Sequence, residues 1–101
     1  MSNVAETILN QLGGNKFIVM TGSKNFLNLG NGLRMKLTRN KSKAQFLKIE
    51  LTGSDLYNMT FFSARSTEND IILTTKEKVE GVYFDQMNRI FEQVTGLYTS
   101  L

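Results

Sequence analysis

The chain has 101 residues, of which 41% are hydrophobic, a composition typical of one packed domain and not of a disordered tail. Its net charge is +3, but no acidic residue lies between Thr7 and Ile49. Residues 1–49 therefore carry a net +7, whereas residues 50–101 carry a net −4. Cysteine and histidine are absent, which excludes disulfides, thiolate or imidazole metal sites and histidine-based catalytic triads.

The first predicted element is a short helix that ends at Leu12. Apolar residues recur at every fourth position from Val4, which is the spacing of one helix face. Asn3 and Glu6 have the spacing of a capping box, and the glycines at 13–14 predict the end of the helix. A glycine pair beside a lysine suggests a phosphate loop, but such a loop follows a strand, whereas this pair follows a predicted helix.

The next segments predict a strand and a loop. Residues 16–20 form a short apolar run rich in β-formers, which favours a strand. Residues 21–32 are rich in glycine, serine and asparagine and favour a loop.

Three alternating segments, at residues 33–38, 46–51 and 57–62, predict an antiparallel meander. In each segment apolar residues occupy every second position, so that one face of the sheet is apolar. The polar stretches at 39–43 and 52–55 are the predicted turns.

The C-terminal third predicts one more strand and a helix. Residues 71–75 favour an edge strand, and residues 76–80 fit either the end of that strand or the start of the helix. The helix is predicted from a single apolar stripe and from a glycine at its C-terminal end, which are Tyr83, Met87, Ile90, Phe91, Val94 and Gly96.

These elements predict a single α+β domain over residues 1–101. An antiparallel sheet of four to five strands is flanked by an N-terminal and a C-terminal helix in two layers, α-β4/5-α. The chain has neither an apolar stretch long enough to span a membrane nor a secretory signal, so we expect a cytoplasmic protein.

The sheet face opposite the predicted core carries the candidate functional residues. Cations that can bind phosphates alternate there with aromatic rings that can stack on bases, which favours single-stranded nucleic acid. The candidates include the basic turn and are Arg34, Lys36, Arg39, Lys41, Lys43, Phe46, Lys48 and Phe62. No residue pattern indicates catalysis, a metal site or a cofactor, so we expect a binding protein and not an enzyme.

Other interpretations of this face remain open. It can be an ordinary solvated face on which Lys36 or Lys48 pairs with Glu50 across strands. The rings of Phe46 and Phe62 can instead be covered by the loop at 21–32 or by a second subunit. The protein would then be a protein-interaction module or a homodimeric structural protein that uses the same face.

Four segments, at residues 8–26, 32–37, 55–57 and 91–101, resemble small uncharacterised proteins encoded by tailed phages, prophages and related mobile elements. The clearest motifs are the LGGNKF run followed by MTG, and the TGL near the end. The resemblance implies an accessory protein acting in the cytoplasm of a bacterial host. It would handle nucleic acid or inhibit a host defence protein.

Overall fold

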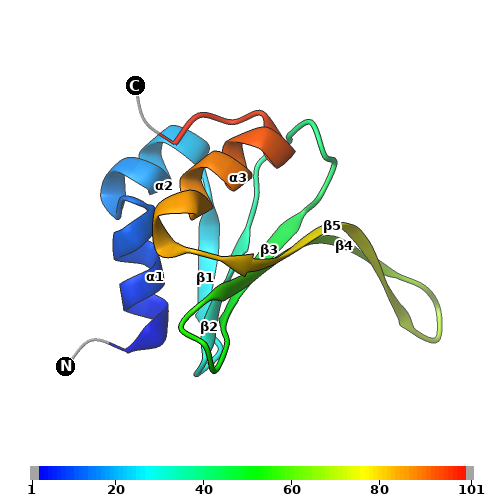
Figure 1. Ribbon diagram of the computed structural model, residues 1–101. Helices are drawn as coiled ribbons and strands as arrows, with labels where there is room; N and C mark the ends of the chain where they lie inside the picture. The colour runs from blue at the N-terminus through cyan, green and yellow to red at the C-terminus, as the bar shows by residue number, and fades with distance from the viewer. Residues whose placement is uncertain (1–2, 100–101) are drawn as a thin grey trace.

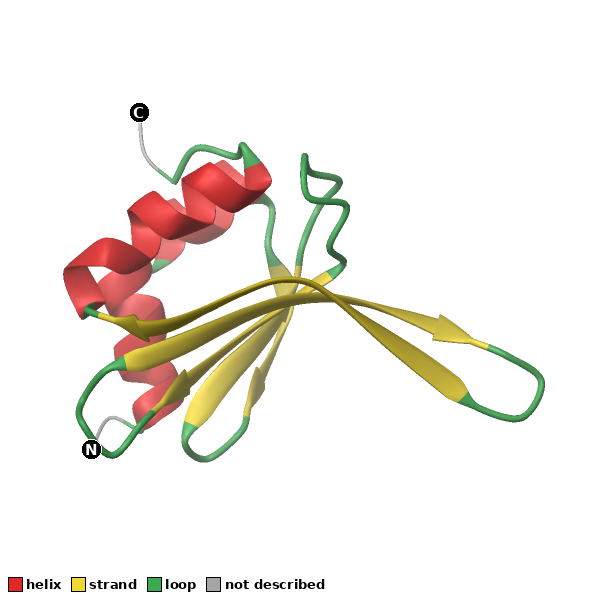
Figure 2. Cartoon of the chain, turned by 45° about the vertical axis from the view of Figure 1, so that its right-hand side comes forward, coloured by secondary structure: helices red, strands yellow, loops and turns green. Residues whose placement is uncertain are grey.

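A computed structural model describes residues 3–99 of the protein. Its elements, labelled in Figure 1, are α1 (Val4–Leu12), α2 (Asn15–Thr21), β1 (Lys24–Asn28), β2 (Gly32–Lys36), β3 (Phe46–Leu51), β4 (Tyr57–Ser66), β5 (Ile71–Val82), the 3₁₀-helix η1 (Phe84–Gln86) and α3 (Met87–Thr95). The strands form one antiparallel sheet in the order β1-β2-β3-β4-β5. The α-helices lie together on one face of this sheet (Figure 2), which confirms the predicted two-layer α+β fold.

The core lies between the sheet and the helices, and the alternation of the three predicted strands places it there. Alternate residues in the central parts of β2, β3 and β4 are buried, namely Leu33, Met35, Leu47, Ile49, Tyr57, Met59 and Phe61. From the helices, Phe17 and Phe91 meet edge to face with ring centroids 5.1 Å apart, and Phe61 lies 6.3 Å from Phe91. These rings join α2, α3 and β4 into one apolar cluster.

The N-terminal helix begins and ends as predicted. The Asn3 side chain accepts a hydrogen bond of 2.8 Å from the backbone N–H of Glu6, and Gly13 follows the last helical residue. The strand predicted at residues 16–20 is wrong, because these residues lie in α2. Phe17 and Thr21, four positions apart, are buried, whereas Val19 between them is 80% exposed. Burial every fourth residue is the spacing of a helix, and a run of four apolar residues is too short to distinguish a strand from a helix by pattern.

Strand β1 lies inside the segment predicted to be a loop. It is an edge strand with an irregularity between Lys24 and Leu27, and Asn25 there has a φ of 54°. Only Phe26 of its five residues is partly buried. Asparagine and lysine disfavour strands, so pairing with β2 and not local propensity holds this segment extended.

The last hairpin is longer than the sequence predicts. Strand β4 continues to Ser66, and the ambiguous residues 76–80 belong to β5, whose pairing with β4 shifts at two points. The far part of this hairpin projects beyond the helices as an arm (Figures 1 and 2). Helix α3 begins at Met87, so Tyr83 lies outside its apolar stripe and is 58% exposed. Gly96 follows α3 in the left-handed conformation, as predicted.

Tyr57 joins β4 to α1 and gives a first prediction. Its hydroxyl donates a hydrogen bond of 2.7 Å to Oε1 of Gln11. Burial raises the pKa of Tyr57, and the charge of Asp55 also raises it. Because the folded protein holds this proton more tightly than the unfolded chain, the stabilisation is complete below a pH of about 10 and is lost as the pH rises through the folded pKa.

We therefore expect Tyr57→Phe to cost about 1 kcal/mol of unfolding free energy at neutral pH, from the lost hydrogen bond. The wild type should lose more stability above pH ~10 than the variant does. Urea unfolding of both proteins at neutral and alkaline pH measures the difference. The other tyrosines and the lysines contribute equally to the pH dependence of both proteins, so their contributions cancel in the comparison. Identical pH dependence of the two proteins would contradict the prediction.

Candidate nucleic-acid interface

The candidate site lies on the sheet face away from the helices. Arg34, Phe46, Lys48 and Phe62 are each half-buried there, whereas the residues between them point into the core. They line an open groove of about 520 Å³, which we call the sheet groove. Leu29, Ile71 and Leu73 complete its apolar wall.

Two cations face each other across neighbouring strands in this groove. Arg34 of β2 is directly opposite Lys48 of β3. Two residues further along β2, Lys36 is directly opposite Lys24 of β1. Like charges directly opposite in a sheet are destabilising, by roughly 0.2–1 kcal/mol for each pair. Among residues 3–99 the only ion pair within 4.0 Å is that of Lys48 with Glu50, at 3.6 Å. Arg34, Lys24 and Lys36 thus have no carboxylate partner among the described residues.

The pairing of Lys48 with Glu50 differs from the sequence-based alternative. Both residues lie on β3, two positions apart, and not on neighbouring strands. Their side chains are 38% and 37% exposed, so water screens the pair and it contributes little to stability.

The two phenylalanines form a stack that begins with Arg34. Phe46 and Phe62 are directly opposite on β3 and β4, with ring centroids 5.4 Å apart and ring planes at 21°. The Arg34 guanidinium carbon lies over the Phe46 ring, 5.6 Å from its centroid. Since Arg34 and Phe62 approach from the strands on either side of β3, both faces of Phe46 are occupied. Among residues 3–99 no further ring stacks on Phe62, whose other neighbouring strand, β5, places Thr75 directly opposite it.

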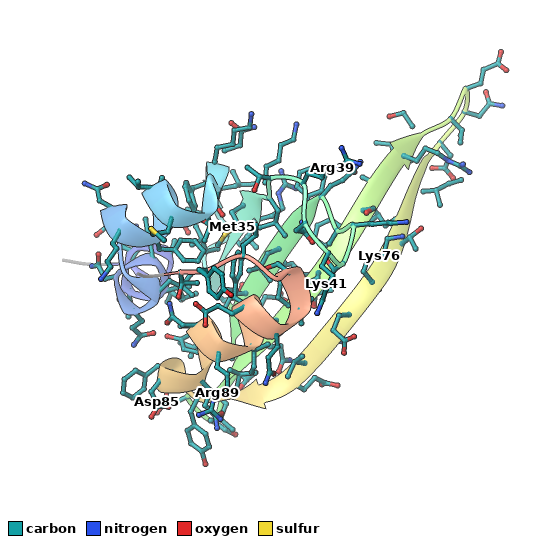
Figure 3. All side chains as sticks on the ribbon, turned by 90° about the horizontal axis from the view of Figure 1, so that it is seen from above. Met35, Arg39, Lys41, Lys76, Asp85 and Arg89 are labelled. Atoms are coloured by element: carbon teal, nitrogen blue, oxygen red, sulfur yellow. The ribbon has the colours of Figure 1, made fainter. Side chains whose placement is uncertain are left out.

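The basic loop between β2 and β3 is separate from the sheet groove. The Lys41 N–H donates a hydrogen bond of 2.9 Å to the Thr95 carbonyl at the end of α3, so the loop bends toward the helix layer. Figure 3 shows Arg39 and Lys41 on this loop, and Lys41 beside the last turn of α3. Arg39 and Lys43 line a different hollow, of about 370 Å³, at the base of the loop. The structure thus brings together Arg34, Phe46, Lys48 and Phe62 but not Arg39, Lys41 and Lys43.

The aliphatic wall of the groove was not predicted from the sequence. Leu29 follows β1, whereas Ile71 and Leu73 come from β5, so the wall depends on pairings between distant segments. The one available signal was the alternation of Ile71 and Leu73, which places both on one face of their strand.

Searches against protein-family models, curated proteins and solved structures find no match to this chain. Within residues 3–99, no helix is long and apolar enough to cross a membrane. The same residues contain no group of three carboxylates that could hold a metal ion. What the site can do follows from its own geometry, which offers Arg34 without a carboxylate partner, Lys48 beside it in an exposed pair with Glu50, two stacked rings and an apolar wall.

Proposed function

We propose that the protein is a non-catalytic accessory protein that binds single-stranded nucleic acid in the sheet groove. The observation that carries this proposal is the opposed pair of Arg34 and Lys48 beside the stacked rings of Phe46 and Phe62. A phosphate between the two cations would relieve their repulsion and gain hydrogen bonds from both. The adjacent aromatic ring offers a stacking surface for a base that is not held in a duplex.

The stack assigns a different role to each aromatic ring. Phe46 supports Arg34 on one side and Phe62 on the other, so its own faces are not free for a base. Phe62 stacks on one ring and lines the groove, so it is the proposed base-stacking residue. Arg34 and Lys48 would hold the phosphate, and Lys36 and Lys24 at the neighbouring position would hold the next one.

Binding assays with short oligonucleotides test the proposal. We expect labelled single strands of about 12 nucleotides to bind more tightly than a duplex of the same length. With the two phosphates assigned above, affinity should fall roughly sevenfold between about 50 and 200 mM salt. Fluorescence anisotropy measures both comparisons, and absence of binding at the lower salt concentration would contradict the proposal.

Two variants and one control locate the site. Phe62→Ala should weaken binding about fivefold or more, because base–aromatic stacking contributes about 1–3 kcal/mol. Arg34→Ala with Lys48→Ala should weaken binding and also reduce its salt dependence. Lys41→Ala is the matched control, because it removes one cation from the loop docked on α3. An equal loss of affinity in the control would place the site outside the groove.

A second candidate function rests on the apolar wall of the same groove. Leu29, Ile71 and Leu73 offer a surface for apolar side chains, next to two cations. Such a groove also fits an acidic, amphipathic segment of a host protein, as expected for an inhibitor of a host defence protein. If the protein binds neither single-stranded nor duplex oligonucleotides, that result would favour this alternative.

A further inference from the structure

The outer edge of β5 is an unprotected strand edge. β5 is the last strand of the sheet, and its first five residues, Ile71–Thr75, lie on the projecting arm (Figure 2). Ile71, Ile72 and Leu73 are 63%, 42% and 65% exposed. The segment has no charge, proline or glycine, which are the residues that usually keep an edge strand from pairing with another chain.

Strand β1 and the later part of β5 have features that hinder pairing with another chain, and Ile71–Thr75 lacks them. β1 has only five residues, and its pairing is irregular between Lys24 and Leu27, where Asn25 has a positive φ. The later part of β5, residues 76–80, carries four charges and contains an irregularity at its start. Unprotected pairing groups are therefore concentrated at Ile71–Thr75.

The backbone groups of Leu73 and Thr75 point away from β4. The N–H of Ala64, opposite Leu73, donates to Oε1 of Gln45, and the carbonyl of Phe62, opposite Thr75, accepts from the N–H of Gln45. Ala64 and Phe62 thus direct their backbone groups toward β3. In an antiparallel ladder, two opposite residues whose backbone groups point away from each other form a pair without hydrogen bonds between them. Leu73 and Thr75 belong to such pairs with Ala64 and Phe62. Their N–H and C=O groups therefore point to the free edge of β5.

The charges that flank the segment make it complementary to itself. Asp70 precedes it and Lys76 follows it. When two copies pair antiparallel about a two-fold axis at Leu73, Ile71 meets Thr75, and Asp70 meets Lys76 of the second copy at both ends. A parallel pairing would instead bring Asp70 beside Asp70. Charge thus selects the antiparallel arrangement, which is the symmetric one.

We propose that the protein forms a symmetric dimer through antiparallel pairing of the Ile71–Thr75 edges, with Leu73 on the two-fold axis. The two sheets then form one continuous sheet, and the axis runs perpendicular to it. Ile71 and Leu73 line the sheet groove, so both grooves lie on the same side and adjoin at the axis. Dimer formation does not depend on the proposed function; if that function holds, the dimer gives one strand two adjacent sites.

A register-specific crosslink tests the dimer, because the chain has no cysteine of its own. Leu73→Cys places two thiols on directly opposite residues, whose Cα atoms are about 5.5 Å apart in such a pair. This distance allows a disulfide. Thr75→Cys is the control, because its two thiols would be displaced by four residues, about 14 Å along the strand. Mild oxidation should crosslink the first variant and not the second, and the reverse result would overturn the proposed register.

The mass of the protein in solution tests the association without crosslinking. Light scattering at increasing concentration should approach twice the 11.4 kDa of one chain. Leu73→Lys should raise the dimer dissociation constant on the order of 100-fold, since two leucines lose their burial and two like charges meet at the axis. Val19→Lys, at an exposed apolar position on α2, should leave it unchanged. A monomeric wild type at all concentrations, or a dimer that persists in Leu73→Lys, would overturn the proposal, whatever the result of the oligonucleotide assays.

Discussion

Replacing Phe91 by alanine is expected to lower the free energy of unfolding by about 3–5 kcal/mol, the range for removal of a fully buried aromatic side chain. Phe91 is 0% exposed and contacts the ring of Phe17 from α2 and that of Phe61 from β4. Its removal leaves a cavity where the helix layer meets the sheet. The backbone on all three sides belongs to helices or strands, so the cavity cannot collapse without moving one of them.

Phe84→Ala is the matched control, because it removes the same side chain at a position that is 57% exposed, in η1 just before α3. We expect it to cost less than about 1 kcal/mol. Urea unfolding followed by circular dichroism measures both variants. With a slope of about 1–3 kcal/mol per molar urea, the Phe91 variant should unfold at least about 1 M earlier. Equal midpoints for the two variants would contradict the placement of Phe91 in the core.

The meander could be predicted from the sequence because its pattern is strict. In β2, β3 and β4, buried and surface residues alternate without interruption from Leu33 to Met35, from Leu47 to Ile49 and from Tyr57 to Phe61. Alternation defines both the strand and its faces, so Arg34, Phe46 and Lys48 could be placed together on the surface without knowledge of the pairing.

Helix α2 and strand β1 could not be predicted because their conformations depend on distant contacts. Phe17 packs against Phe91, far along the chain, and the Thr21 carbonyl at the end of α2 accepts a hydrogen bond of 2.8 Å from Thr38. Neither contact leaves a local pattern. The same limit applies to the site, since the docking of Lys41 on Thr95 removes the basic loop from the sheet groove. Charge counted along a sequence does not reveal on which layer of the fold it lies.

Gly32→Ala is expected to cost about 3 kcal/mol, the upper part of the range for inserting a methyl group into a packed site. A Cβ atom at Gly32 would lie 2.2 Å from the Ile49 carbonyl oxygen and 3.0 Å from the Glu50 Cα atom. Both are backbone atoms of β3, so no side chain can rotate away. The clash must instead move β2 away from β3 next to the Gly32–Glu50 pair. Because Arg34 lies two residues further along β2, the same displacement would alter the opposed pair of Arg34 and Lys48.

Gly53→Ala controls for the loss of a glycine, because a Cβ atom there meets nothing within 4 Å and the backbone is not left-handed. We expect this variant to lie within about 0.5 kcal/mol of the wild type. Urea midpoints measure both variants, and amide hydrogen exchange at Leu33 and Ile49, whose N–H groups belong to the bonded pairs of the β2–β3 ladder, should accelerate in Gly32→Ala alone, because that ladder opens more often. If Gly32→Ala matched Gly53→Ala in both measurements, β2 and β3 would not approach each other as closely as the register requires, and the opposed cations would lose the geometry that makes a phosphate their natural partner.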